Sequence, residues 1–359
     1  MTTPSYPSRP MASTSTVLLL LCCIFASAWT TSQQDEALTM DRFHRWMEQH
    51  GKSYATVDEK LRRFEVYRRN VEHIETTNRE GKLSYTLGEN QFTDLTDEEF
   101  LAKYTSRYVV PPPDMTSNEE EEAETVITTR AGDVLEGHGG NLSMLPESID
   151  WRAVGAVTPV KDQGDCGSCW AFATVAAVES LNQIKNGNLV DLSEQELLDC
   201  GQYNCISGTA SGAILWIWKN GGITTEADYP YTGKKGVCDK TKLNHHTVSV
   251  LTTKYVVSNN EQKLMEAVAK QPVTVAIEVA ASFAKYKSGV YLGPCGYAHN
   301  HIVTIVGYGK DASTGKKYWI VKNSFGTSFG MDGYILFERG VPDPRGLCGI
   351  ARFPVYPSM

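Results

Sequence analysis

The sequence predicts an α+β protein with an N-terminal helical region and a larger two-lobed part. One lobe should be mainly helical, and the other an antiparallel, β-barrel-like sheet. Apolar residues recur at helical spacing across residues 36–105, Pro, Glu and Gly dominate residues 109–144, and the last 215 residues carry helical patterns before strand patterns. The 359 residues carry a net charge of −8, so the chain lacks the basic excess typical of nucleic-acid-binding proteins.

The N-terminus has the pattern of a secretory signal peptide, which we expect to occupy residues 1–28. The apolar run Val17–Phe25 follows Arg9 and precedes the small residues Ala26-Ser27-Ala28. This run is too short to span a bilayer, and no other stretch is long enough, so we expect no membrane span. We therefore expect the protein to enter the secretory pathway and to reach a vacuole or lysosome, or the extracellular space.

Residues 29–108 should form a helical domain of their own. Within a helix expected over 57–78, six residues recur every three or four positions and so share one stripe. They are Glu59, Arg63, Tyr67, Asn70, Ile74 and Asn78. The segment Gly88–Asp94 follows, and its alternating character suits a short strand or a turn.

Residues 109–144 should form a flexible acidic linker that is exposed and open to cleavage. Pro111-Pro112-Pro113 cannot continue a helix, and Glu119–Glu122 is a run of four like charges. Asn141 begins an Asn-Leu-Ser triplet, so we expect it to be a glycosylation acceptor.

Residues 145–359 divide at about residue 255 into a mainly helical lobe and a mainly β lobe. Helices are expected over Ser168–Leu181, after the capping box that begins at Ser193, and over Gly212–Lys219. Strands are expected at Val273–Glu278, Ile302–Gly307, Tyr318–Lys322 and Tyr334–Glu338. A cleft between two lobes is a common place for a functional site.

The cysteines point to one unpaired thiol. Cys22 and Cys23 would leave with the signal peptide, and seven cysteines remain. They are Cys166, Cys169, Cys200, Cys205, Cys238, Cys295 and Cys348. In an oxidising compartment six of them can pair, and the seventh is a reactive thiol, an inert buried cysteine or half of an intermolecular bridge.

The segment Gln163–Phe172 allows three interpretations. Cys166 and Cys169 form a CxxC pair that could be a redox disulfide, although the usual redox context is a small intracellular unit. A zinc site would need a second pair of ligands, for which His245 and His246 are candidates. The third interpretation is a cysteine nucleophile at a helix N-terminus, where the macrodipole favours the thiolate.

The third interpretation is favoured because a histidine and an amide are available downstream. His299 and His301 precede one apolar strand, and Asn323 follows another. His301 lies 132 residues and Asn323 154 residues after Cys169, close to the spacing of a known cysteine–histidine–asparagine signature. Spacing alone does not decide between the two histidines.

These segments together resemble papain-like cysteine peptidases that are made as preproenzymes. The helical stripe resembles the ERFNIN motif of the prodomain, with Tyr67 where Phe is usual, and Gly88–Asp94 resembles the second prodomain motif. Leu145-Pro146 resembles the start of a mature enzyme. The motifs are similar to those of the cathepsin L-like branch, and of plant enzymes in particular.

The resemblance implies a two-lobed papain-like fold, an inhibitory prodomain and a catalytic set. The set is Cys169 as nucleophile, His301 as base, Asn323 as the orienting amide and Gln163 as an oxyanion donor. It also implies the disulfides Cys166–Cys205, Cys200–Cys238 and Cys295–Cys348, which leave Cys169 free.

The resemblance further implies a substrate pocket that is apolar but altered in shape. Its residues would be Ser207, Gly208, Thr209, Ala210, Ala276, His299, Asn300, Ile302 and Phe353. Ile206 and Ser207 depart from the usual Asn-Gly, and Phe325 and Phe329 replace two tryptophans. Because phenylalanine keeps most of the apolar cover over the histidine, we expect an altered pH dependence rather than a loss of activity.

The predicted function is that of a cysteine endopeptidase, made as an inactive zymogen, that hydrolyses peptide bonds through a thiolate–imidazolium pair and an acyl-enzyme. Its partners would be peptide and protein substrates, its own prodomain and cystatin-like inhibitors. We expect a monomer with no cofactor, no metal and no nucleic-acid partner. The alternative is a catalytically silent homologue that serves as a binding or storage protein.

Overall fold

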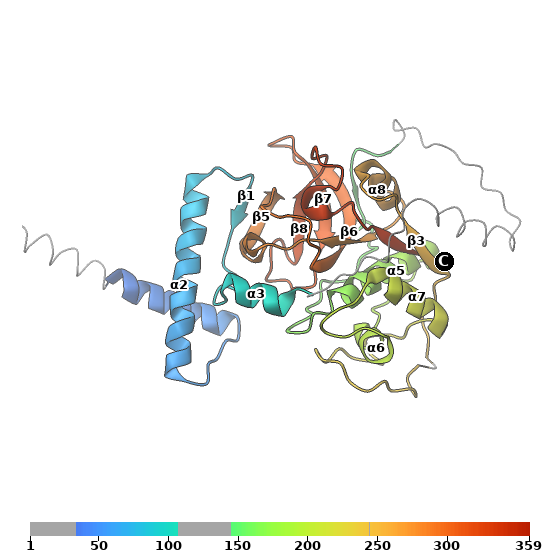
Figure 1. Ribbon diagram of the computed structural model, residues 1–359, viewed down its shortest axis with the longest axis horizontal. Helices are drawn as coiled ribbons and strands as arrows, with labels where there is room; N and C mark the ends of the chain where they lie inside the picture. The colour runs from blue at the N-terminus through green and yellow to red at the C-terminus, as the bar shows by residue number, and fades with distance from the viewer. Residues whose placement is uncertain (1–33, 107–144, 244) are drawn as a thin grey trace, which may run out of the picture. The chain divides into compact units, whose positions relative to one another are not determined.

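The computed structural model describes residues 34–106, 145–243 and 245–359 (Figure 1). The predicted signal peptide and the whole of the predicted linker, with Asn141, lie outside these residues. The chain divides into two compact units, one ending at Arg69 and one beginning at Asn70. No helix of the described residues is long and apolar enough to cross a bilayer.

The first unit is held together by an aromatic cluster between two helices. These are a helix of residues 34–49 and the first part of α2 (Val57–Glu80). The ring of Phe43 lies 5.8 Å from that of Trp46 and 5.1 Å from that of Tyr67. Phe43 and Tyr67 are both fully buried, so Tyr67 fills its position on the predicted stripe as a core residue.

The second unit contains the elements that form the site. Its helices are the rest of α2, α3 (Asp97–Tyr104), α5 (Cys169–Asn186), α6 (Glu194–Cys200), α7 (Ala210–Asn220) and α8 (Glu261–Val268), with the 3₁₀ turns η2 (Ala281–Lys285) and η3 (Leu347–Gly349). Its strands are β1 (Tyr85–Leu87), β2 (Ile149–Asp150), β3 (Thr252–Tyr255), β4 (Val273–Ile277), β5 (Tyr286–Tyr291), β6 (His301–Lys310), β7 (Lys317–Lys322), β8 (Tyr334–Glu338) and β9 (Val355–Ser358).

Side-chain caps fix where several of these helices begin. Thr96 and Glu99 form a reciprocal capping box at the start of α3. The Ser193 hydroxyl accepts a hydrogen bond from the backbone of Glu196 and so starts α6 where the sequence predicts. Helix α5 ends at Gly187, which adopts a left-handed conformation with φ of 67°.

The strands of the described residues form one sheet in the order β1-β5-β8-β7-β6-β4-β9-β3, with β2 paired to β6. All pairings are antiparallel except β5 with β8, which is parallel. The connection between these two strands passes through β6 and β7, and such a long crossover permits a parallel arrangement. The sequence predicts β4, β6, β7 and β8, but it does not single out α8, β3, β5 or β9.

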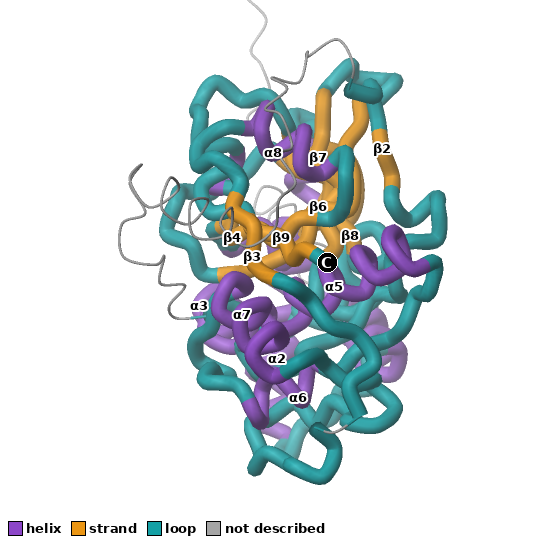
Figure 2. The backbone as a smooth tube through the Cα atoms, turned by 90° about the vertical axis from the view of Figure 1, so that its right-hand side faces the viewer, coloured by secondary structure: helices purple, strands orange, loops and turns teal. Residues whose placement is uncertain are grey.

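Two hydrophobic cores correspond to the two predicted lobes. One contains Trp170 and Ile214 from α5 and α7, and the other contains Phe283 and Trp319 from the β region. Figure 2 shows α5, α6 and α7 gathered beyond one edge of the strands. The site described below lies where α5 meets β6, between these cores.

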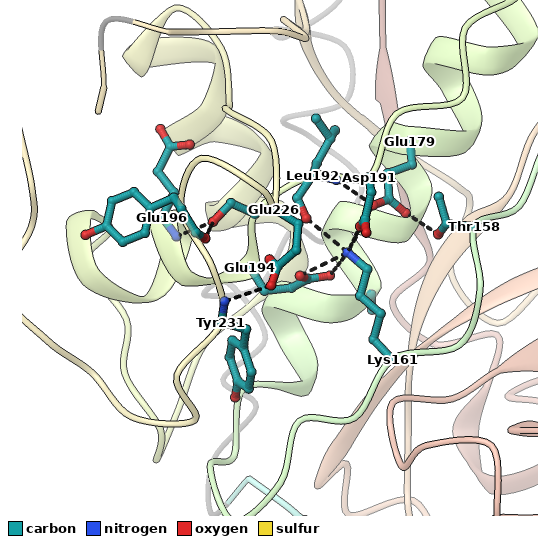
Figure 3. Close-up of polar contacts among 12 residues, drawn as sticks. Thr158, Lys161, Glu179, Asp191, Leu192, Glu194, Glu196, Glu226 and Tyr231 are labelled. Atoms are coloured by element: carbon teal, nitrogen blue, oxygen red, sulfur yellow. Dashed lines mark hydrogen bonds and ion pairs between the residues drawn. The ribbon is translucent and has the colours of Figure 1, made fainter. Parts of the chain in front are cut away.

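A largely buried group of charges, the Lys161 cluster, connects α5 and α6 to the loop that precedes α5; only its Asp191 carboxylate is exposed. It consists of Lys161, Glu179, Asp191 and Glu194 (Figure 3). The Lys161 ammonium lies 3.2 Å from Glu179 and 2.8 Å from Glu194. Burial opposes its charge, yet the carboxylates of Glu194 and Glu179 raise the pKa of Lys161 well above its ordinary value.

Removing the cation should leave buried carboxylates uncompensated, so Lys161→Met should lower the free energy of unfolding by about 3–5 kcal/mol. Urea unfolding of the precursor, carried out in a Cys169→Ala background to prevent self-digestion, measures this loss. Lys263→Met is the control, because the partly exposed Lys263–Glu266 pair on α8 should be worth at most about 1 kcal/mol. Equal losses for the two variants would contradict this account of the cluster.

Candidate active site

The free thiol lies at the N-terminus of a buried helix. Cys169 is the first residue of α5 and is fully buried. Ser168 is the N-cap residue, and Cys169 is the one cysteine of the described residues outside a disulfide. The helix macrodipole therefore favours the thiolate at this position.

Three disulfides surround this thiol, and they are the pairs that the resemblance implies. They are Cys166–Cys205, Cys200–Cys238 and Cys295–Cys348. Because Cys166 is bonded to Cys205, it is not available to Cys169 as a redox partner. The structure therefore argues against the redox interpretation of the CxxC segment.

His301 and Asn323 meet where two paired strands begin and end. His301 is the first residue of β6, and Asn323 directly follows β7. The His301 Nε2 lies 2.8 Å from the Asn323 Oδ1, and the same oxygen accepts a hydrogen bond from the backbone of Ser324. Since this oxygen only accepts, Nε2 carries the proton and Nδ1 remains free to act as a base.

The Cys169 thiol lies near the start of the same strand. A backbone hydrogen bond from Ile302, which directly follows His301, favours the thiolate form of Cys169. Helix α5 is also joined to β6 by a hydrogen bond of 3.0 Å from the Thr304 hydroxyl to the carbonyl oxygen of Ala173. The thiol and the imidazole thus come from two elements that pack directly against each other.

An aromatic side chain covers the histidine. The ring of Phe325, which is fully buried, lies 4.7 Å from the His301 ring. Three rings from residues 92–104 pack edgewise on Phe325, at centroid distances between 5.6 and 5.9 Å. They belong to Phe92, Phe100 and Tyr104. Phenylalanine thus retains apolar cover at this position.

Gln163 is held in one orientation by Ser324. The Ser324 hydroxyl donates to the Gln163 Oε1 at 2.6 Å, and the Gln163 backbone N–H donates to the Ser324 carbonyl at 2.9 Å. The Gln163 Nε2 donates to the Cys166 carbonyl at 3.0 Å and lies 3.5 Å from the carbonyl oxygen of Tyr104. The amide donor therefore faces a carbonyl group of the prodomain.

The segment after α3 passes directly over the thiol. The Ser106 Oγ lies 3.6 Å from the Cys169 Sγ and donates to the Gly167 carbonyl at 3.2 Å. The Ser106 backbone N–H donates to the Asn300 carbonyl at 2.7 Å. This segment occupies the space from which a substrate would approach the nucleophile.

Charged and polar contacts bind residues 85–106, which include this segment, to both lobes. Lys103 forms an ion pair with Asp165 at 3.3 Å, and Asp97 forms one with Lys285 at 2.8 Å. The Asn90 side chain donates to the carbonyl of Ala284 at 2.6 Å. Strand β1 adds backbone pairing with β5, so residues 85–106 bind over a long stretch of surface.

The predicted substrate-binding residues of the helical lobe lie at the start of α7. Gly208 packs so closely on Trp170 that an added Cβ would lie 2.4 Å from the indole ring. Thr209 caps α7, whose first residue is Ala210, and Ser207 lies just before Gly208. These residues have small side chains rather than bulky ones, and Gly208 and Ala210 are buried.

The remaining predicted pocket residues lie in the β lobe. Ala276 of β4 pairs with Ile302 of β6. The His299 ring lies edge-on to Phe353 at 5.1 Å, and its Nε2 is 3.3 Å from the Gly349 carbonyl. The Asn300 side chain accepts a hydrogen bond from the Val279 backbone N–H at 2.7 Å and donates one to the Val279 carbonyl at 3.0 Å. His299 is thus clearly distinguished from His301, which alone contacts Asn323.

The described residues give little support for a zinc site. Across the described residues, no group of three or more His, Cys, Asp or Glu side chains is arranged to hold a metal ion. His246 instead lies 3.1 Å from the amide nitrogen of Asn220.

Comparisons with known proteins agree with this geometry. Residues 145–358 match the model of the "Papain family cysteine protease", and residues 43–100 match the "Cathepsin propeptide inhibitor domain (I29)". The chain is 44% identical to fruit bromelain of Ananas comosus over 96% of its own length and 93% of that protein. It is also 44% identical to the KDEL-tailed cysteine endopeptidase CEP2 of Arabidopsis thaliana, over 96% of its length and 92% of that protein.

Solved structures give the same result. A recombinant stem bromelain precursor matches with a TM-score of 0.80 and 45% identity, covering 89% of this chain and 99% of that one. Bromelain from Ananas comosus in complex with the E64 inhibitor matches with a TM-score of 0.58 and 49% identity, over 60% of this chain and all of that one.

The chain belongs to the papain family of cysteine proteases. It is the zymogen of a cysteine endopeptidase, and its N-terminal domain is an inhibitory propeptide. The named relatives are proteases, which disfavours the alternative of a silent binding or storage protein.

Several residues at this papain-family site carry no sequence motif. Ser106, Ser324 and Tyr231 contact the site through hydroxyl groups, which occur throughout the chain. Ser324 could have been found from its position next to Asn323. Nothing in the local sequence distinguishes Ser106 or Tyr231.

The zymogen holds the thiol and the imidazole in their neutral forms. Burial raises the pKa of the Cys169 thiol, and burial also lowers the pKa of His301 to about 4. At neutral pH the thiol is therefore protonated and the imidazole is not. We therefore expect the predicted thiolate–imidazolium pair to form only after the propeptide leaves.

Removal of the propeptide should therefore greatly increase the reactivity of the thiol. We expect iodoacetamide to alkylate Cys169 at pH 6 at least about 100-fold faster in the processed enzyme than in the precursor, because only a solvated, ionised thiol reacts. Mass spectrometry over time measures both rates, and denatured precursor gives the rate of the unprotected thiol. Equal rates before and after processing would show that the propeptide controls neither access nor ionisation.

Proposed function

We propose that Cys169, His301, Asn323 and Gln163 hydrolyse peptide bonds by acyl transfer. The Cys169 thiolate attacks the carbonyl carbon, and the oxyanion is bound by the Gln163 Nε2 and the Cys169 backbone N–H. Each such donor is worth about 3–4 kcal/mol. His301 then protonates the leaving amine as the carbon–nitrogen bond breaks.

The second half of the reaction uses the same groups in reverse. His301, now neutral, takes a proton from water, whose oxygen attacks the thioester. The carbon–sulfur bond breaks and the Cys169 thiolate leaves. His301 keeps the proton taken from water, so the resting thiolate–imidazolium pair is restored. Asn323 holds the imidazole in the required orientation throughout. The observation that carries this proposal is the 2.8 Å contact between His301 and Asn323 at the start of β6, the strand to which α5, with the free thiol at its N-terminus, is hydrogen-bonded.

We also propose that substrates bind across both lobes. Gly208 and Asn300 would pair with the substrate backbone, since the Asn300 carbonyl already accepts the Ser106 N–H. Ser207, Thr209, Ala210, Ala276, His299, Ile302 and Phe353 would line the main specificity pocket. Their apolar and small side chains favour apolar substrate residues.

The precursor would be processed within the secretory pathway. Residues 1–28 would be removed as a signal peptide, residues 29–108 would act as the inhibitor, and the linker 109–144 would be cut near Leu145. The mature enzyme would act as a monomer in a vacuole or lysosome, or outside the cell, where cystatin-like inhibitors could regulate it. The signal-like N-terminus and the kinship with plant proteases support this route.

The nucleophile is tested by Cys169→Ala. Hydrolysis of a peptide substrate should fall by roughly 10⁴-fold or more, because the covalent route is lost. The variant should also fail to process itself in acid, yet wild-type enzyme should cut it near Leu145, which shows that it is folded. Substantial activity in the purified variant would refute the assignment of Cys169.

The Asp97–Lys285 pair should help to retain the propeptide. Asp97→Asn removes the attraction to the buried ammonium of Lys285, so activation at a fixed mildly acidic pH should be about three- to tenfold faster. Lys285→Met should have a similar effect, and the double variant should add little to either. Glu98→Gln, at the exposed neighbouring position, is the matched control. If Asp97→Asn is activated at the same rate as wild type, this ion pair does not help to retain the propeptide.

A further inference from the structure

One tyrosine hydroxyl connects the two sides of the oxyanion site. The Tyr231 hydroxyl donates to the Gln163 carbonyl oxygen at 2.8 Å and lies 2.6 Å from the Ser168 Oγ. A carbonyl oxygen can only accept, so the phenolic proton goes to Gln163 and the Ser168 hydroxyl donates to Tyr231. The result is a directed chain from Ser168 through Tyr231 to Gln163.

Each end of this chain adjoins one of the proposed oxyanion donors. Gln163 provides the side-chain donor, and Ser168 directly precedes Cys169, whose backbone N–H is the other donor. Ser168 is the N-cap residue of α5, but its side chain makes no capping hydrogen bond. Its hydroxyl instead lies 2.6 Å from the Tyr231 hydroxyl and 3.4 Å from the carbonyl oxygen of Cys166, so its shorter contact is the one with Tyr231.

Tyr231 is itself held firmly in place. Its ring lies edge-on to Phe172 of α5, with centroids 4.8 Å apart. Its backbone N–H donates to the Glu226 carboxylate at 2.8 Å (Figure 3). Burial raises the pKa of Tyr231 to about 12, so the hydroxyl remains a donor over the working range of the enzyme.

We propose that Tyr231 is a positioning residue, whose hydroxyl fixes the separation of the two oxyanion donors. The proposal rests on the proposed roles of Gln163 and Cys169 in binding the oxyanion. Tyr231 does not touch the substrate, so its effect appears only in how well the donors match the tetrahedral transition state. Ser324 also restrains Gln163, so loss of the Tyr231 hydroxyl should weaken the site without abolishing it.

The test compares Tyr231→Phe with Tyr229→Phe in the acid-activated full-length precursor. Tyr229 lies in the same segment and is buried, but its hydroxyl donates to Asp199 and not to the site. In Tyr231→Phe, kcat per active site should fall about tenfold with an unchanged KM, since small misplacements are costly in the transition state. Tyr229→Phe should match wild type.

Two inhibitors separate the oxyanion from the thiol. A peptide aldehyde adds to the Cys169 sulfur and forms a tetrahedral thiohemiacetal, so its Ki should rise about tenfold in Tyr231→Phe. The epoxide E-64 is opened by the same sulfur without forming an oxyanion at an acyl carbon, so its inactivation rate should not change. E-64 titration also counts the active sites. A merely structural role would lower that count but leave kcat per site and the aldehyde Ki unchanged.

Gln163→Ala separates failure of this inference from failure of the proposed function. If Gln163→Ala raises the aldehyde Ki and Tyr231→Phe does not, Tyr231 is not a positioning residue, while the proposed mechanism stands. If Gln163→Ala leaves both kcat and the aldehyde Ki unchanged, the oxyanion role of Gln163 is wrong and this inference falls with it. Should Tyr231→Phe fail to fold, Ser168→Ala interrupts the same hydrogen-bond chain. It should show the same fall in kcat and the same rise in the aldehyde Ki. Unchanged values of both in Ser168→Ala would overturn the proposal.

Discussion

The site depends on the ends of three elements, α5, β6 and β7, which meet between two hydrophobic cores. Strand β6 begins at His301 and β7 ends just before Asn323, and their antiparallel pairing brings the imidazole and the amide to one edge of the sheet. Helix α5 packs against β6, and this packing carries Cys169 to the same edge. The catalytic geometry therefore follows from the packing of the cores, and a small shift of α5 against the sheet would separate the thiol from the imidazole.

The propeptide keeps this site inactive in two ways, and both have the same cause. Ser106 and its neighbours exclude substrate from Cys169, and the same coverage excludes water from the thiol and the imidazole. Without water, neither charge is favoured, and both groups remain neutral. We therefore expect departure of the propeptide to expose both groups to water together and so to favour their ionisation.

The sequence predicts those features that depend on local pattern. The buried helix after Ser168, the apolar strand after His301 and the helical stripe around Tyr67 are all visible because neighbouring residues determine them. The role of Tyr231 is not visible, since it arises from a contact across 68 residues. The parallel pairing of β5 with β8 is equally hidden, because β5 includes Gly289 and takes its direction from a long crossover.

The Lys161 cluster has a geometric role that apolar residues could not fill. Burying charges is costly, and a well-packed apolar core can be as stable as a buried ion pair. Its carboxylate Glu179, however, accepts the backbone N–H of Leu192, and neighbouring Glu226, which is within electrostatic reach of Lys161, accepts that of Tyr231. These bonds hold two loops in fixed positions, one of which carries the hydroxyl that reaches Gln163. We infer that the charges are there to fix loop geometry at the oxyanion site, which links the buried core of the helical lobe to catalysis.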